Sequence, residues 1–162
     1  MNKQKESEND FFQEVEKKSR PPRIGITIGD AAGIGPEITL KALLDKSVRE
    51  VCLPIVIGDA RFLERLADKF DLKINFETIE PDKEFSSDSD KILCYDLANL
   101  NQKIIAGEES GTTGKASAEN IETAVKLCLE KKIDAIATAP ISKKLFQWAV
   151  MIFRDIRRCW RI

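Results

Sequence analysis

The sequence contains no histidine among its 162 residues. Histidine is the side chain that most often serves as a general base near neutral pH and most often ligates metals. Its absence excludes a serine–histidine–aspartate triad built from this chain alone, and it excludes a metal site made of imidazole groups. Any such group would have to be supplied from elsewhere.

Paired cysteines, long apolar runs and net charge are missing as well. The four cysteines lie far apart without a Cys-x-x-Cys pair, which favours buried free thiols in a reducing cytoplasm over a zinc or redox motif; they are Cys52, Cys94, Cys128 and Cys159. No apolar run approaches the ~20 residues of a membrane span, and the polar first residues contain no signal-peptide core. The formal net charge of -1 provides no field for nucleic acid or an anionic membrane. We therefore expect a cytoplasmic protein that binds neither.

The most informative feature present is a glycine-rich segment, Gly-Asp-Ala-Ala-Gly-Ile-Gly-Pro at residues 29–36. It follows an apolar run at 24–28 and precedes apolar residues at helical spacing in 36–45, so the pattern predicts a strand, a loop and a helix. Glycine allows positive φ and close approach of a ligand, and proline suits the first helical position. Such a helix start favours a phosphate or carboxylate. The candidate site residues are Gly29, Asp30, Gly33 and Gly35, although a simple tight turn explains the spacing equally well.

The same order of strand, turn and helix recurs along the chain. An apolar run at 53–57 leads through Gly58 and Asp59 to a predicted helix at 60–70, which favours parallel βαβ units. Further strands are expected at 74–79 and 91–95, a helix at 116–131 and a buried strand at 133–138. Residues 1–20 are a charged leader that we expect to be disordered, which leaves 21–149 as one α/β portion.

A second candidate loop follows the expected strand at 133–138. Open α/β sheets bind ligands at the carboxyl ends of their strands, where this loop lies. Its Lys143 either anchors an anionic substrate or is an ordinary solvated lysine, and the sequence leaves both open. A phosphate-binding P-loop at residues 109–116 is not expected, because Glu109 replaces its first glycine and Ala116 its serine or threonine.

Taken together, residues 23–38 resemble the opening strand and loop of the 4-hydroxythreonine-4-phosphate dehydrogenase family. Three later blocks agree in order, at 54–61, 114–119 and 134–143, so the resemblance covers residues 22–149. It implies an isocitrate/isopropylmalate dehydrogenase-like α/β fold with a mostly parallel sheet, here incomplete. Ala31 stands where the family usually has proline, and this difference should loosen the loop slightly.

The resemblance also implies an activity and its partners. The family oxidises 4-(phosphooxy)-threonine with NAD or NADP, lets the product decarboxylate, uses a divalent metal, works as a homodimer and serves pyridoxal phosphate biosynthesis. Its metal is held by histidines, and a His-Thr pair beyond the Ala-Pro-Ile-x-Lys loop contacts substrate. None of these histidines exists here, so we expect no metal ligand and no catalytic residue, and the cofactor-binding residues are unknown. A phospho-threonate substrate and a non-catalytic phosphate- or nucleotide-binding module are the alternatives.

Residues 150–162 depart from the family pattern. One permissible set of codons for them, read with a single G restored in front, encodes Gly-Tyr-Asp-Phe-Pro-Gly-His-Thr-Glu-Met-Leu-Ala-Asp, which contains the missing His-Thr pair. We therefore expect an out-of-frame tail, caused by a single-base deletion or a sequencing error near the Ala149 codon. The alternative is a basic amphipathic helix for an anionic membrane surface, with an apolar stripe of Ala149, Ile152, Phe153, Ile156 and Trp160.

Overall fold

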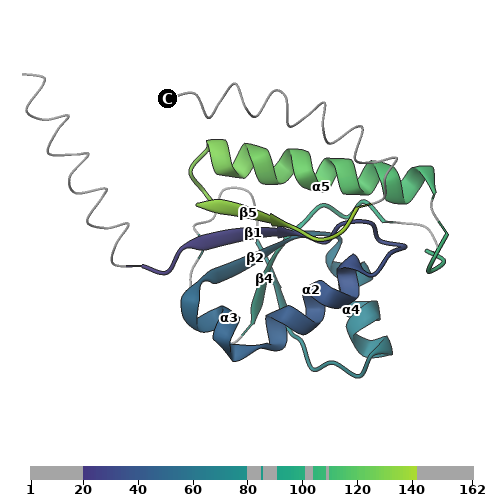
Figure 1. Cartoon of the computed structure of the whole chain (residues 1–162), viewed down its shortest axis with the longest axis horizontal. Helices are drawn as coiled ribbons and strands as arrows, with labels where there is room; N and C mark the ends of the chain where they lie inside the picture. Colours follow the sequence, from purple (N-terminus) through teal and green to yellow (C-terminus); the bar gives the residue numbers. More distant parts are fainter. Residues whose placement is uncertain (1–19, 80–84, 86–90, 101–103, 109, 142–162) are drawn as a thin grey trace, which may run out of the picture.

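The computed structural model describes residues 20–79, 85, 91–100, 104–108 and 110–141. The expected leader up to residue 19, Lys143 and the expected out-of-frame tail lie outside these residues. The described residues form nine elements in chain order (Figure 1): β1 (Arg23–Thr27), α2 (Gly35–Leu44), α3 (Lys46–Val51), β2 (Leu53–Gly58), α4 (Ala60–Lys69), β3 (Phe76–Thr78), β4 (Ile92–Asp96), α5 (Gly111–Leu129) and β5 (Ala135–Thr138).

The five strands form one sheet in the order β3-β4-β2-β1-β5, and every neighbouring pair is parallel. Helices α2 and α4 lie on one face of the sheet, and α5 lies on the other (Figure 1). This arrangement confirms the predicted α/β fold with a mostly parallel sheet. Because all strands run the same way, the loops after β1, β2, β4 and β5 emerge at one edge.

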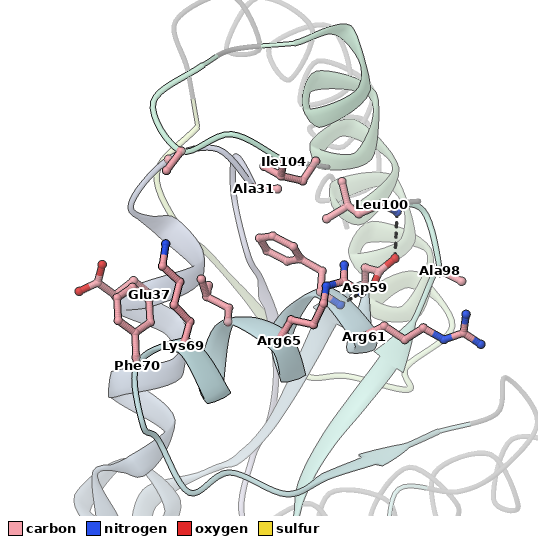
Figure 2. Close-up of a pocket in the computed structure, with 14 residues that line it drawn as sticks. Ala31, Glu37, Asp59, Arg61, Arg65, Lys69, Phe70, Ala98, Leu100 and Ile104 are labelled. Atoms are coloured by element: carbon pink, nitrogen blue, oxygen red, sulfur yellow. Dashed lines mark hydrogen bonds between the residues drawn. The ribbon is translucent and has the colours of Figure 1, made fainter. Parts of the chain in front are cut away.

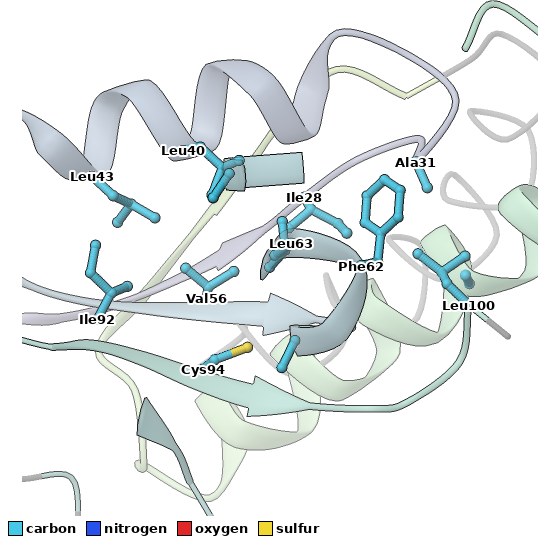
Figure 3. Close-up of a cluster of buried hydrophobic side chains, with 13 residues drawn as sticks. Ile28, Ala31, Leu40, Leu43, Val56, Phe62, Leu63, Ile92, Cys94 and Leu100 are labelled. Carbon is cyan, nitrogen blue, oxygen red and sulfur yellow. The ribbon is translucent and has the colours of Figure 1, made fainter. Parts of the chain in front are cut away.

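Two apolar cores explain the unbroken apolar run of β2. Successive side chains of a strand point to opposite faces, so Val56 packs under α2 and α4 while Ile55 and Ile57 pack under α5. The first core gathers side chains from both helices and the sheet (Figure 3), among them Ile28, Leu40, Leu43, Leu63, Ile92 and Cys94. A strand buried on both faces in this way is typical of parallel sheets.

Helix α5 begins at Gly111, five residues before the predicted start at residue 116. Ser110 and Thr113 form a capping box, in which Thr113 N donates to Ser110 Oγ at 3.1 Å and Ser110 N donates to Thr113 Oγ1 at 3.3 Å. The segment 111–115, expected to precede the helix, is therefore its first turn. Helix α3 was not predicted; Asp45 ends α2 and caps α3 by accepting from Ser47 N at 2.9 Å.

The strand expected at 133–138 is present as β5, but the expectation that it is buried is wrong. The strand covers Ala135–Thr138, and the side chains of Ala135, Ala137 and Thr138 are exposed. The reason is its position, because β5 ends the strand order and pairs with β1 alone among the described strands.

Arg20 and Arg23, near the start of β1, both bind Asp134, the residue before β5. Arg20 Nη1 and Nη2 lie 2.7 Å and 3.1 Å from the two carboxylate oxygens of Asp134. The backbone N–H of Arg23 donates to Asp134 Oδ2 at 2.9 Å. The Arg20 guanidinium, aided by these Arg23 hydrogen bonds, holds the pKa of Asp134 well below its usual range.

The cysteine prediction is confirmed in part. Cys52, Cys94 and Cys128 are free thiols, but only Cys94 is fully buried, and Cys159 lies outside the described residues. Burial raises the pKa of both Cys52 and Cys94, because desolvation disfavours the thiolate. None of the helices in the described part of the chain is long and apolar enough to span a bilayer.

Candidate ligand site at the glycine loop

At two positions of the loop after β1, a side chain larger than that of glycine would clash with the backbone. Gly29 has φ of 70°, a conformation that side chains rarely adopt, and a Cβ there would overlap the carbonyl oxygen of Pro140. A Cβ at Gly35 would overlap the carbonyl oxygen of Ile28. At Gly33, by contrast, the nearest atom would be Asp30 O at 3.4 Å, an ordinary contact. Gly29 and Gly35 therefore fix the path of the loop, and Gly33 does not.

The loop satisfies much of its own hydrogen bonding. Asp30 N donates to Pro140 O at 3.2 Å, Ala32 N donates to Asp30 Oδ1 at 3.0 Å, and Gly33 N donates to Asp30 O at 3.0 Å. These N–H groups already have acceptors, one of them a carboxylate. The first N–H groups of a helix have no intrahelical acceptor. In α2 the second residue, Pro36, has no N–H, so Gly35 and Glu37 supply the backbone N–H groups of the helix start.

Ser117 holds the loop from the opposite face of the sheet. Its Oγ lies 2.8 Å from Gly29 O and 2.9 Å from Thr113 O, and its single proton is shared between the two carbonyl groups. Ser117 is buried on α5. Sequence reasoning missed this residue, although a serine on the inner face of an amphipathic helix is a signal that could have found it.

The loops after β1 and β5 meet at a hollow of about 280 Å³. Its lining consists of Asp30, Ala32, Gly33, Ile34, Gly107, Pro140 and Ile141. Gly107 comes from the segment before α5, and its N–H donates to Ala32 O at 2.8 Å. The structure thus brings Asp30 and Gly33 together with Pro140 at the carboxyl edge of the sheet. The predicted Lys143 lies outside the described residues.

A larger hollow of about 570 Å³ lies on the other side of the loop, beside α4 (Figure 2). Ala31 and Gly33 border it, together with the α4 side chains Arg61, Arg65 and Lys69. Asp59, the N-cap of α4, accepts from Phe62 N at 2.7 Å and from Leu100 N at 2.9 Å. No local pattern in the sequence predicts this hollow, because its walls come from segments far apart in the chain.

The family resemblance implies a divalent metal, but the residues present do not fit one. Within the described ranges, no group of three or more histidine, cysteine, aspartate or glutamate side chains could hold a metal ion. The whole sequence has no histidine.

An all-parallel sheet covered by helices on both faces, with a hollow where the loops leave its carboxyl edge, is the architecture of α/β ligand-binding enzymes. Comparison with known families narrows this class. The model of the pyridoxal phosphate biosynthetic protein PdxA matches residues 50–159, and the chain belongs to that family. The matched range overlaps the expected out-of-frame tail at 150–159.

Named relatives and solved structures agree with the family assignment. A protein of Oceanobacillus iheyensis, provisionally assigned as a D-threonate 4-phosphate dehydrogenase, is 43% identical over 130 residues. The D-threonate 4-phosphate dehydrogenase of Cupriavidus necator is 42% identical over 123 residues, 76% of this chain and 37% of its own length. The crystal structure of a 4-hydroxythreonine-4-phosphate dehydrogenase from Burkholderia phymatum is similar with a TM-score of 0.73 at 39% identity, covering 79% of this chain and 39% of that one.

Coverage of the relatives is partial. The match to the Oceanobacillus protein includes 80% of this chain but 39% of the relative. The match to the structure of a 4-hydroxythreonine-4-phosphate dehydrogenase from Klebsiella pneumoniae, with a TM-score of 0.70 and 30% identity, covers 80% of this chain and 39% of that one. The chain therefore spans about two fifths of the length of the relatives it matches, within the isocitrate dehydrogenase-like fold that these structures share.

Proposed function

We propose that this chain contributes the substrate-binding loop of a dehydrogenase that oxidises a phosphorylated hydroxy acid with NAD or NADP and releases a product that decarboxylates. Family membership supports the reaction class. The observation that carries the role of this portion is the 280 Å³ hollow in which Asp30 and Ile34, the N-cap of α2, meet the loop after β5. A cytoplasmic location and a homodimer belong to the same proposal.

The hollow offers two kinds of contact to such a substrate. Ile34, the N-cap residue of α2, lines the hollow, and the N-terminal end of a helix favours an anionic group through the helix dipole. Asp30, whose Oδ1 is bound to Ala32 N, presents a carboxylate that can accept from a hydroxyl or an ammonium group. The two contacts are opposite in polarity, so together they would orient a small molecule that carries both an anion and a donor.

Two substrates fit this description and differ at one carbon. 4-(Phosphooxy)-threonine carries an ammonium group where 4-phospho-threonate carries a hydroxyl. The curated relatives at 42–43% identity are named for threonate, and the solved structures at 30–39% are named for hydroxythreonine. The higher identity favours threonate 4-phosphate.

A second candidate function is a non-catalytic phosphate- or nucleotide-binding module built on the same loop. The observation in its favour is the lack of histidine in the sequence together with the lack of a metal-ligand group among the described residues. Both candidates predict that the 162-residue chain by itself binds but does not turn over.

The test combines binding and turnover on the purified chain. Each phosphorylated acid is added with NAD or NADP and a divalent cation, and both heat of binding and reduced cofactor are measured. We expect binding that Asp30→Asn weakens and no reduced cofactor; the exposed Asp68→Asn serves as the control. Turnover that disappears with a chelator and returns with metal would refute the inactivity of the chain. Absence of binding by both acids would refute the role of the loop.

A further inference from the structure

We propose that the hollow beside α4 is a second anion site, which binds a small organic phosphate through Arg65 and Lys69. It lies on the α2 and α4 side of the glycine loop and shares Gly33 with the hollow described above. It does not depend on the proposed dehydrogenase substrate. Its volume of about 570 Å³ lies within the range of about 300–1,000 Å³ usual for small-molecule sites.

Three cations border this hollow along one helix. Arg61, Arg65 and Lys69 are four residues apart, so they follow one another along the same side of α4 over about 12 Å, at about 1.5 Å per residue. Like charges at this spacing destabilise a helix. The acidic residues of α4, Glu64 and Asp68, are not among those that line the hollow. An anion between the basic side chains would relieve their repulsion.

The acidic side chains of the lining are already engaged. Both oxygens of Asp59 accept backbone N–H groups, from Phe62 and Leu100. Glu37 Oε1 lies 2.6 Å from Lys41 Nζ, in an ion pair on α2. Glu37 is therefore paired on α2, and the lining holds three basic side chains against one carboxylate, Asp59, that has no ion pair among the described residues.

The orientation of the cations selects two of the three. Arg65 extends over the hollow toward Asp59 and Lys69 extends on the side of Glu37, whereas Arg61 points away from both, below Ala98 in the view (Figure 2). In the described part of the chain Arg65 has no carboxylate partner within ion-pair distance, and Lys69 Nζ lies 6.0 Å from the centre of the Phe70 ring. A guanidinium can hold a phosphate through two parallel hydrogen bonds, and a nearby ammonium adds a point charge.

The remaining lining is apolar, which favours an organic phosphate over a bare ion. Phe62, Leu66 and Leu100 lie around the hollow, with Phe62 and Leu100 buried beneath it. An aromatic or aliphatic group of a ligand would cover these side chains while its phosphate pairs with Arg65. The charge of the smaller hollow has the opposite sign, because its lining includes Asp30 and no lysine or arginine.

The test uses ADP, adenosine and inorganic pyrophosphate as probes of the 162-residue chain, by calorimetry and by backbone amide shifts. We expect ADP to bind more tightly than either pyrophosphate or adenosine, to perturb amides of residues 61–70, and to bind more weakly at high salt. Arg65→Gln should weaken ADP binding about tenfold, the effect of losing one charge-assisted hydrogen bond. The ADP affinity of Arg65→Lys should lie between those of the parent chain and Arg65→Gln.

The matched control is Arg49→Gln, which removes an exposed arginine of α3 that does not line the hollow. Circular dichroism of each variant establishes that the fold is retained, and Lys69→Gln provides a second, independent loss of charge. The proposal is wrong if ADP affinity is unchanged in both Arg65→Gln and Lys69→Gln, if Arg49→Gln weakens binding equally, or if ADP shifts are confined to the glycine loop. If pyrophosphate binds as tightly as ADP, the claim that the site prefers an organic phosphate is wrong.

Discussion

Ser117 Oγ on α5 lies 2.8 Å from the carbonyl oxygen of Gly29, 88 positions earlier in the chain. This contact joins the helix on one face of the sheet to the loop that opens the candidate site. Gly29 occupies a left-handed conformation at φ of 70°. The hydrogen bond therefore fixes the carbonyl group of the residue whose backbone turns the chain out of β1.

Ser117→Ala should loosen this loop. The substitution leaves the Gly29 carbonyl without its buried donor, so we expect the free energy of unfolding to fall by about 1–3 kcal/mol. Amide hydrogen exchange at residues 29–35 should accelerate more than exchange in β2. Ser47→Ala, which removes an exposed hydroxyl on α3, is the control. Equal exchange rates in Ser117→Ala and the parent chain would show that the contact does not hold the loop.

Alanine substitutions at the two closely spaced glycines should differ sharply. A Cβ at Gly35 would overlap the Ile28 carbonyl oxygen, whereas a Cβ at Gly33 would meet its nearest atom at 3.4 Å. We expect Gly35→Ala to destabilise the protein by about 1–3 kcal/mol, as for overpacked sites, and Gly33→Ala to be nearly neutral. Urea denaturation measures both. Similar losses in the two variants would contradict the geometry.

The Asp134 carboxylate makes part of the stability depend on pH. Its pKa is lowered in the folded state by Arg20 and then by Arg23, while in an unfolded chain it is about 3.9. A lowered folded pKa stabilises the protein above the unfolded value, and this stabilisation is lost as the pH falls below about 4 toward the folded pKa.

Asp134→Asn should therefore lower stability near neutral pH, by about 1–3 kcal/mol for the lost charge-assisted hydrogen bonds, and should lose less stability than the parent chain on acidification. Thermal unfolding at several pH values measures the difference. The exposed Asp68→Asn on α4 is the control. Parallel pH profiles for Asp134→Asn and the parent would refute the contribution of this pair.

Exposed apolar side chains at the start of α2 should promote self-association. Ile34 is 59% exposed, and Ile38, one turn later, is 45% exposed. Burying such surface stabilises an association by about 25 cal/mol per Å². We therefore expect the purified chain to bind a hydrophobic dye and to form oligomers or aggregates. Ile34→Ser with Ile38→Ser should reduce both, measured by dye fluorescence and light scattering. Leu129→Ser, at a single exposed leucine of α5, is the comparison. A monomer without dye binding would contradict this expectation.

The genomic bases around the Ala149 codon test the origin of residues 150–162. We expect the bases after the Ile162 codon to continue, in the shifted frame, as a dehydrogenase sequence with further histidines. Restoring one base should yield a metal-dependent homodimer. Non-coding bases in that frame would refute the frameshift, and the match of the family model through residue 159 makes this measurement decisive.

Local patterns in the sequence were sufficient for the glycine loop and for the order of the strands and helices, apart from the short helix α3. The apolar run at 53–57 and the helical spacing at 60–70 agree with β2 and α4 within one residue, because each pattern reflects neighbours close in sequence. The missed start of α5 has a local cause too, since its first turn is stabilised by the Ser110 and Thr113 side chains rather than by an apolar face.

The sequence alone determined the family, the absence of histidine, and the need for glycine between β1 and α2. Only the tertiary structure decided that β5 is exposed, that Ser117 holds the loop, that Arg20 reaches Asp134 across 114 positions, and that the two hollows differ in charge. The physical reason is that helix and strand periodicity act over a few residues. Strand order and the packing of α4 and α5 on opposite faces bring distant polar groups together, and no local pattern records those distances.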